Sequence, residues 1–207
     1  MARGDMPGEP GSRLTRAQLV RATRDCIVER GVGRTRVRDI AQRAGTSPGL
    51  ISYYFGTLDA VLLAAFEFSD ADYYRQFAVV EARHDDAISR LRGLVELALH
   101  ADESVGYWAM WLELGVESRR RPDLMELRSR LTRSWVALIR RCVRLGQTQG
   151  SFGPGDDNDI ALRLALLMEG MGMALLAPPG VVVGRSLPEL WLSVAATELD
   201  CPRLATP

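Results

Sequence analysis

Apolar residues recur at intervals of three and four along almost the whole chain, without the alternation typical of strands. The pattern is strongest between Leu124 and Leu145, where apolar residues keep to one face of a long helix. With 207 residues and 47% hydrophobic residues, the chain is long enough for a small first domain and a larger second one. We expect an all-α protein of about nine helices, at 15–31, 37–44, 48–55, 57–83, 88–99, 105–115, 124–150, 160–177 and 187–194.

The segment from residue 37 to 58 has the pattern of two short helices joined by a tight turn. The first helix ends at Gly45, because glycine adopts the left-handed conformation after a helix at least cost. Ser47 is suited to the N-cap of the second helix and Pro48 to its first turn. Gly56 ends that helix, and Thr57 caps the next. This is the pattern of a helix-turn-helix unit, whose second helix enters the DNA major groove.

Positive charge is concentrated in the first part of the chain. Residues 13–58 hold nine Arg and three acidic residues, whereas residues 59–207 hold sixteen Arg and twenty-one acidic residues. Such a division favours attraction of the first part to DNA phosphates, although arginines that are merely solvated on a three-helix bundle remain an alternative. We predict a disordered tail at 1–12, a helix-turn-helix domain at 13–58, a ligand-binding and dimerisation domain at 59–202, and a tail at 203–207.

The residues from Thr35 to Phe66, TRVRDIAQRAGTSPGLISYYFGTLDAVLLAAF, together with IVERG before them, resemble the TetR/AcrR family of bacterial regulators. Farther along, WAMWLELGVESRRRPDLMEL is similar to the body of the choline-responsive BetI repressors. The resemblance implies a homodimeric regulator, most simply a repressor, that binds an inverted-repeat operator in double-stranded DNA. It also implies release of the operator when a small-molecule effector binds the second domain and the helix at 57–83 swings.

The resemblance also places the residues expected to contact DNA. Many relatives have Tyr where this chain has Ser52, and Lys where it has Leu58, so Arg36, Thr57 and the two tyrosines are expected to carry more of the phosphate anchoring. The predicted DNA-contacting residues are Thr35, Arg36, Arg38, Ser47, Pro48, Gly49, Leu50, Ser52, Tyr53, Tyr54 and Thr57.

Residues 160–177 are apolar on every side of the predicted helix, apart from Arg163, Glu169 and two glycines. A helix of this kind needs to be buried all round, which a single small domain rarely achieves. The helix after it begins with a capping box at Ser186 and Glu189. By resemblance, these two helices pair with their copies in a second subunit. The alternative is an ordinary monomer core.

Large, adaptable side chains in the second domain are candidates for an effector cavity. The carboxylate of Glu169 either pairs with an internal Arg or faces that cavity, where it would attract a hydrophobic or cationic amphipathic effector. Simple core packing is the alternative role for the aromatic and Met residues. The predicted ligand-binding residues are Trp108, Trp111, Trp135, Met168, Glu169 and Met171.

Little in the sequence favours catalysis. The segment Gly45–Gly49 matches the G-x-S-x-G pattern of hydrolases, but a helix precedes Ser47, and Pro48 has no N–H for an oxyanion hole. The three Cys are isolated, which fits thiols in a reducing cytoplasm. No segment predicts export or a membrane span. We therefore expect a cytoplasmic regulator with no catalytic residues, metal or cofactor. The alternative is a constitutive DNA-binding module whose second domain serves only dimerisation or protein contacts.

Overall fold

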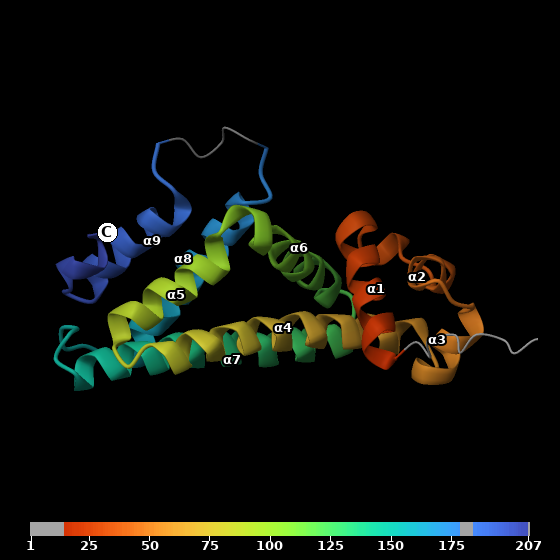
Figure 1. Ribbon diagram of the computed structural model, residues 1–207, viewed down its shortest axis with the longest axis horizontal. Coiled ribbons are helices and arrows are strands. Elements are labelled where there is room, and N and C mark those ends of the chain that lie inside the picture. The colour runs from red at the N-terminus through yellow and green to blue at the C-terminus, as the bar shows by residue number, and fades with distance from the viewer. Residues whose placement is uncertain (1–14, 179–183, 207) are drawn as a thin grey trace, which may run out of the picture. The chain divides into compact units, whose positions relative to one another are not determined.

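The computed structural model describes residues 15–178 and 184–206, and within these ranges the chain forms nine α-helices, two short 3-10 helices and no strand (Figure 1). This confirms the all-α prediction. The predicted disordered tail at 1–12 lies outside the described residues. The α-helices are α1 (Arg16–Arg30), α2 (Val37–Ala44), α3 (Pro48–Phe55), α4 (Leu58–Arg83), α5 (Ala87–Leu99), α6 (Ala101–Ser118), α7 (Pro122–Thr148), α8 (Asp157–Ala174) and α9 (Leu187–Glu198).

The chain divides into two compact units between Ala65 and Phe66, inside α4. The sequence analysis placed the domain boundary at 58/59. The difference arises because the first turns of α4 contribute to the core of the first unit, where Val61 is fully buried. The first unit therefore needs part of α4 to complete its core.

In the first unit, α1 packs against α2, and α2 against α3. Helix α1 begins with a capping box, in which the Thr15 side chain accepts from the Gln18 backbone N–H and the Gln18 side chain accepts from that of Thr15. The shared core consists of Leu19, Ala22, Cys26, Ile40, Ala41, Ile51 and Val61. These residues come from all three helices and α4, so each helix is held by its apolar stripe.

In the second unit, α7 packs against α5, α6 and α8. Side-chain contacts also join it to α4: the rings of Tyr73 and Trp135 lie 5.4 Å apart, and Glu67 pairs with Arg130 at 2.7 Å. Phe77 is buried one turn beyond Tyr73 on α4. Aromatic and aliphatic side chains thus fill the space between α4, α6 and α7.

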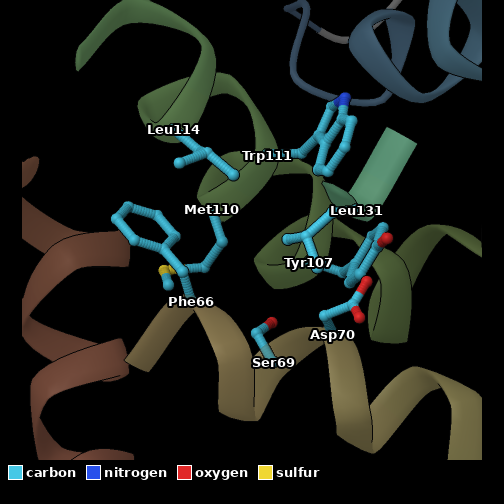
Figure 2. A pocket seen from close by; sticks show the side chains of 8 residues that line it. All are labelled: Phe66, Ser69, Asp70, Tyr107, Met110, Trp111, Leu114 and Leu131. Atoms are coloured by element: carbon cyan, nitrogen blue, oxygen red, sulfur yellow. The ribbon is translucent and has the colours of Figure 1, made fainter. Parts of the chain in front are cut away.

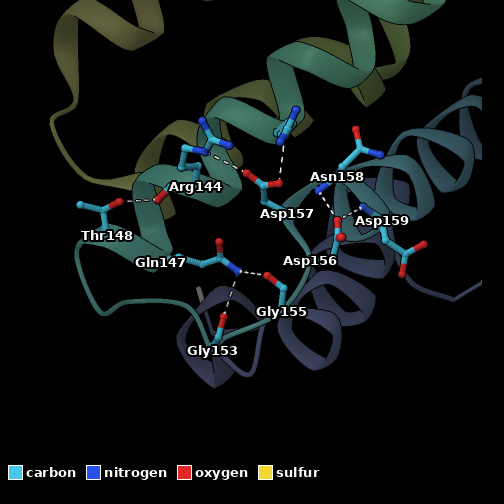
Figure 3. Close-up of polar contacts among 10 residues, drawn as sticks. Arg144, Gln147, Thr148, Gly153, Gly155, Asp156, Asp157, Asn158 and Asp159 are labelled. Carbon is cyan, nitrogen blue, oxygen red and sulfur yellow. Dashed lines mark hydrogen bonds and ion pairs between the residues drawn. The ribbon is translucent and has the colours of Figure 1, made fainter.

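The loop between α7 and α8 is fixed by polar contacts, which Figure 3 shows. The Asp156 carboxylate accepts from two backbone N–H groups at the start of α8, both at 2.9 Å. Asp157 binds Arg140 and Arg144 of α7 at 2.9 and 2.8 Å. Desolvation alone would raise the pKa of Asp157, but the hydrogen bonds from Arg144 and Arg140 outweigh it and lower that pKa. The start of α8 is therefore anchored to α7.

The end of the chain differs from the prediction of a tail at 203–207. Residues Pro202–Leu204 form a short 3-10 helix, and Leu204 is buried. An Arg92 amino group on α5 donates to the backbone carbonyl of Arg203 at 2.8 Å. A long-range contact of this kind leaves no local sequence signal. None of the described helices could cross a membrane alone; only the bent pair α3 and α4, taken together, has the required length and composition.

Candidate DNA-binding and effector sites

The turn between α2 and α3 has the predicted geometry. Gly45 is left-handed, with φ of 65° and ψ of 37°, and Pro48 occupies the first turn of α3. Ser47 stands at the N-cap position, but its side chain makes no capping hydrogen bond. Ile51 faces the core and is 1% exposed. Because this face is fixed, the opposite face of α3 is held outward.

Most of the predicted DNA-contacting side chains are exposed. Tyr53 is 82% exposed and Tyr54 38%, and their rings meet edge to face at 5.3 Å. Leu50 is half-buried against the core. Thr35 is buried, and its hydroxyl donates to the carbonyl of Gly31 at 2.8 Å, so a direct contact of its side chain with DNA is unfavourable. The remaining predicted residues, Arg36, Arg38, Ser47, Pro48, Gly49, Ser52 and Thr57, are exposed.

Some of these polar groups already have structural partners. One Arg36 amino group donates to the carbonyls of Gly33 and Thr35 at 2.8 and 3.0 Å. The Thr57 hydroxyl accepts from the backbone N–H of Ala60, as predicted for the cap of α4. These groups orient the loops on either side of α2 and α3. Arg38, by contrast, extends from α2 with an exposed side chain.

The positive charge of the first unit is only partly neutralised by its acidic residues. The acidic residues between 13 and 58 all form ion pairs: Asp39 pairs with Arg30, and Asp25 and Glu29 with Arg43. The other arginines of this region therefore determine its surface potential. A basic surface around an outward-facing aromatic helix attracts and positions a DNA duplex.

The predicted ligand-binding residues do not gather around one cavity. Trp108, Trp135, Met168 and Met171 are all buried, and Met168 is fully so. The Trp108 ring Nε1 donates to the carbonyl of Ala98 at 2.6 Å. These environments favour core packing, the alternative role for these residues.

Trp111 and Glu169 line a wide surface groove of about 460 Å³ between α6, α7 and α8. Arg119 and Arg128 line the same groove. Desolvation raises the pKa of Glu169, although Arg128 and a hydrogen bond from Trp111 act in the opposite direction. The prediction offered two alternatives for Glu169, a pair with an internal Arg or a position facing a cavity. Among the described residues no ion pair joins Glu169 to an Arg, and its side chain lines an open groove that also carries arginines.

A second, smaller pocket lies within the helical body, between α4, α6 and α7 (Figure 2). Its volume is about 10 Å³, enough for roughly one water molecule. Asp70 and Tyr107 lie together at one end, and Phe66 lies at the other. The lining residues are Phe66, Ser69, Asp70, Tyr107, Met110, Trp111, Leu114 and Leu131.

Asp70 is the functional candidate that sequence reasoning missed. It occupies a core position of α4, four residues after Phe66 and three before Tyr73, both of which are buried. The sequence carried one signal for it: an acidic residue on the face of the helix that is otherwise apolar. Burial raises the pKa of Asp70 to about 6, and the charge of Arg130 acts in the opposite direction. Arg130 is itself paired with Glu67 at 2.7 Å.

Comparisons with known proteins agree with this architecture. The model for bacterial regulatory proteins of the tetR family matches residues 19–65, and the model for the C-terminal part of BetI-type transcriptional repressors matches residues 87–199. The second match alone covers more than half of the chain. This chain belongs to the TetR family. It is a DNA-binding transcriptional regulator, as the helix-turn-helix geometry indicates.

Individual relatives support the assignment to the TetR family. The transcriptional regulator BetI of Burkholderia thailandensis is 31% identical over 170 residues, which cover 80% of this chain and 84% of the relative. BetI of Paraburkholderia xenovorans is 32% identical over 130 residues, covering 62% and 67%. A transcriptional regulator of Saccharomonospora viridis, whose crystal structure contains choline, has a TM-score of 0.76 and 28% identity, covering 86% of this chain and 92% of that one.

This TetR-family chain leaves part of its apolar surface uncovered. The prediction that α8 is buried on all sides is not met within one chain, because Leu162 and Leu166 are 42% and 57% exposed. Leu190 and Val194 of α9 are each 37% exposed. Surfaces of this kind on neighbouring helices are typical of protein interfaces.

Cysteines and the hydrolase-like motif carry no visible chemistry in the described residues. Cys26, Cys142 and Cys201 are free and buried, as predicted. Burial raises the pKa of the Cys142 thiol to about 12, which keeps it in the unreactive thiol form. Ser47 lies between two helices and not after a strand.

Proposed function

We propose that this TetR-family regulator is a cytoplasmic repressor that binds an inverted-repeat operator as a homodimer. The observation that carries the proposal is the outward-facing surface of α3, where Tyr53 and Tyr54 are exposed next to uncancelled arginine charge. Aromatic and small polar groups at the start of a recognition helix contact base edges, while arginines and backbone N–H groups position the phosphates.

The second subunit is supported by the uncovered apolar residues of α8 and α9. A two-fold pair of these helices would bury Leu162, Leu166, Leu190 and Val194 of each copy. Dimerisation would also set the recognition helices about 34 to 36 Å apart, or a larger multiple, as required for successive major grooves. The first unit of one subunit, called the head below, makes too few contacts on its own to bind a specific operator.

Release by a small molecule is supported by the choline found in the Saccharomonospora viridis relative and by the mainly apolar pocket with one carboxylate between α4, α6 and α7. We infer that an effector displaces helices of the body and that α4 transmits the change, since the first turns of α4 are part of the head core. A constitutive repressor would instead bind its operator equally well with and without ligands.

Operator binding tests the proposal directly. Fluorescence anisotropy with duplexes from the region upstream of the gene should show salt-dependent binding to one inverted repeat. Arg38→Ala should reduce the slope of log affinity against log salt by about 1 for each phosphate contact that is lost. Arg75→Ala is the matched control, because Arg75 is an exposed arginine of α4 that pairs with Asp72 and lies outside the helix-turn-helix segment.

The control variant should retain the wild-type slope. No binding by the wild-type protein at low salt would contradict the proposal. An equal loss in both variants would mean that the head makes no localised phosphate contact.

A further inference from the structure

The recognition helix α3 has no side chain that could read a base through a pair of hydrogen bonds. Its sequence from Pro48 to Phe55 is PGLISYYF, without a charged or amide side chain. In the major groove, guanine is read chiefly by Arg or Lys and adenine by Asn or Gln, each through two hydrogen bonds. Neither pairing is available from α3, so this helix has to use another feature of the base edges.

Gly49 is a glycine that the fold itself does not require. It lies in the first turn of α3, is exposed, and does not have the positive φ that favours glycine. Within the described part of the chain, a Cβ atom built there would meet only Ser47 Oγ, at 3.8 Å, which is an ordinary contact. Glycine is less favourable in a helix than alanine by about 1 kcal/mol. The open space at Gly49 is therefore explained by a close approach of something outside the chain.

The side chains around Gly49 offer mainly apolar groups. Tyr53 lies one turn later on the same face of the helix and is 82% exposed. Leu50 is half-buried, with part of its side chain against the core of the head. The Ser52 hydroxyl donates to the carbonyl of Pro48 at 3.4 Å, so its proton is used within the helix. A small apolar group on a base edge matches this surface.

Thymine carries such a group. Its 5-methyl group lies in the major groove, where the other three unmodified bases present only polar groups or ring C–H. We propose that α3 recognises its operator half-site through thymine 5-methyl groups, which are received at Gly49 between Leu50 and Tyr53. The inference rests on the proposed function and deepens it, because it names the base feature that the recognition helix reads. It also assigns A·T pairs to the operator positions that face the start of α3.

Replacing thymine with deoxyuridine tests this, because the exchange removes the methyl group and keeps the Watson–Crick pairing. The probe is the inverted repeat found by anisotropy, made once with thymine and once with deoxyuridine in both half-sites. Burial of one methyl group corresponds to about fourfold in affinity. With at least one such contact in each half-site, the wild-type protein should bind the deoxyuridine duplex about tenfold more weakly or worse.

Gly49→Ala places a Cβ atom where the thymine methyl group is received. The variant should bind the thymine duplex about tenfold more weakly than the wild-type protein does. It should bind the deoxyuridine duplex at least as well as the thymine duplex, because removal of the methyl group makes room for the Cβ atom. Its Tm should not fall, since the head has space for the added atom.

Gly33→Ala is the matched control. Gly33 is an exposed glycine of the head outside α3, and an added Cβ atom meets nothing within 4 Å there. This variant should keep the wild-type ratio between the affinities for the two duplexes. A change in that ratio equal to the change in Gly49→Ala would contradict a contact localised at Gly49.

Equal wild-type affinity for the two duplexes would overturn the inference. So would a Gly49→Ala protein that still prefers thymine by the wild-type factor, because Gly49 would then serve an approach to the phosphate backbone. A fall in Tm for Gly49→Ala would show that the fold needs this glycine, which contradicts the argument as well. Failure of the proposed function gives a different result, since the wild-type protein would then bind neither duplex at low salt.

Discussion

Replacing Gly172 with alanine tests how tightly α6 and α8 pack. A Cβ atom at this position would lie 2.1 Å from two atoms of the Trp108 ring, whereas ordinary contacts are 3.4–4 Å. The ring cannot easily withdraw, because it is 2% exposed and its Nε1 donates to the carbonyl of Ala98. Overpacking costs about 1 to 3 kcal/mol, and loss of the buried hydrogen bond costs about 1 to 3 kcal/mol more.

Alanine is also a better helix former than glycine by about 1 kcal/mol, which opposes these losses. We therefore expect Gly172→Ala to lower the free energy of unfolding by about 1 to 5 kcal/mol, and Tm by about 2 to 4 °C for each kcal/mol lost. Gly170→Ala is the matched control, because it lies in the same helix and an added Cβ meets nothing within 4 Å. It should raise Tm by about 2 to 4 °C.

Differential scanning calorimetry at equal protein concentrations measures both changes under the same degree of association. If Gly172→Ala melts at or above the wild-type temperature, the packing argument is wrong. A loss of stability in Gly170→Ala that depends on protein concentration would show that a second subunit approaches α8 there. Gly172 faces Trp108 within its own chain.

Three further results are expected. Tyr54→Ala should weaken operator binding by about 1 to 3 kcal/mol in anisotropy titrations, and a change confined to protein stability would contradict the assigned role. Leu166→Arg should give monomers in sedimentation velocity, whereas a wild-type protein that is already monomeric at micromolar concentration would rule out the dimer. Burial raises the pKa of Asp70 to about 6, so the folded state binds this proton more tightly than the unfolded chain does. The free energy of unfolding should therefore increase as pH falls from about 7 to about 4, and Asp70→Asn should remove this increase in thermal denaturation.

The helix-turn-helix head could be predicted from sequence because its determinants are local. The left-handed Gly45, Pro48 at the first turn of α3 and the cap at Thr57 act on backbone groups within four residues. The capping box of α9 was identified for the same reason. The helical repeat of apolar residues likewise determines the number of helices and most of their bounds.

The tertiary structure decided which of the possible faces each helix buries. The apolar repeat in the sequence does not decide whether Trp108 and Glu169 face the core. Only the packing of α6, α7 and α8 places Trp108 in the core and Glu169 in an open groove. Leu204 was assigned to a tail because its contacts with the body involve residues far away in sequence.

Asp70 illustrates the same limit within the helical body. The sequence contains an acidic residue in the apolar register of α4, yet it does not show whether a distant arginine neutralises it. In the fold, Arg130 is paired with Glu67, and the unpaired Asp70 is beside aromatic rings from α4 and α6. Local sequence thus determines the helices and the turn. Long-range packing determines which charges are left without a partner, because desolvation and pairing depend on neighbours from other helices.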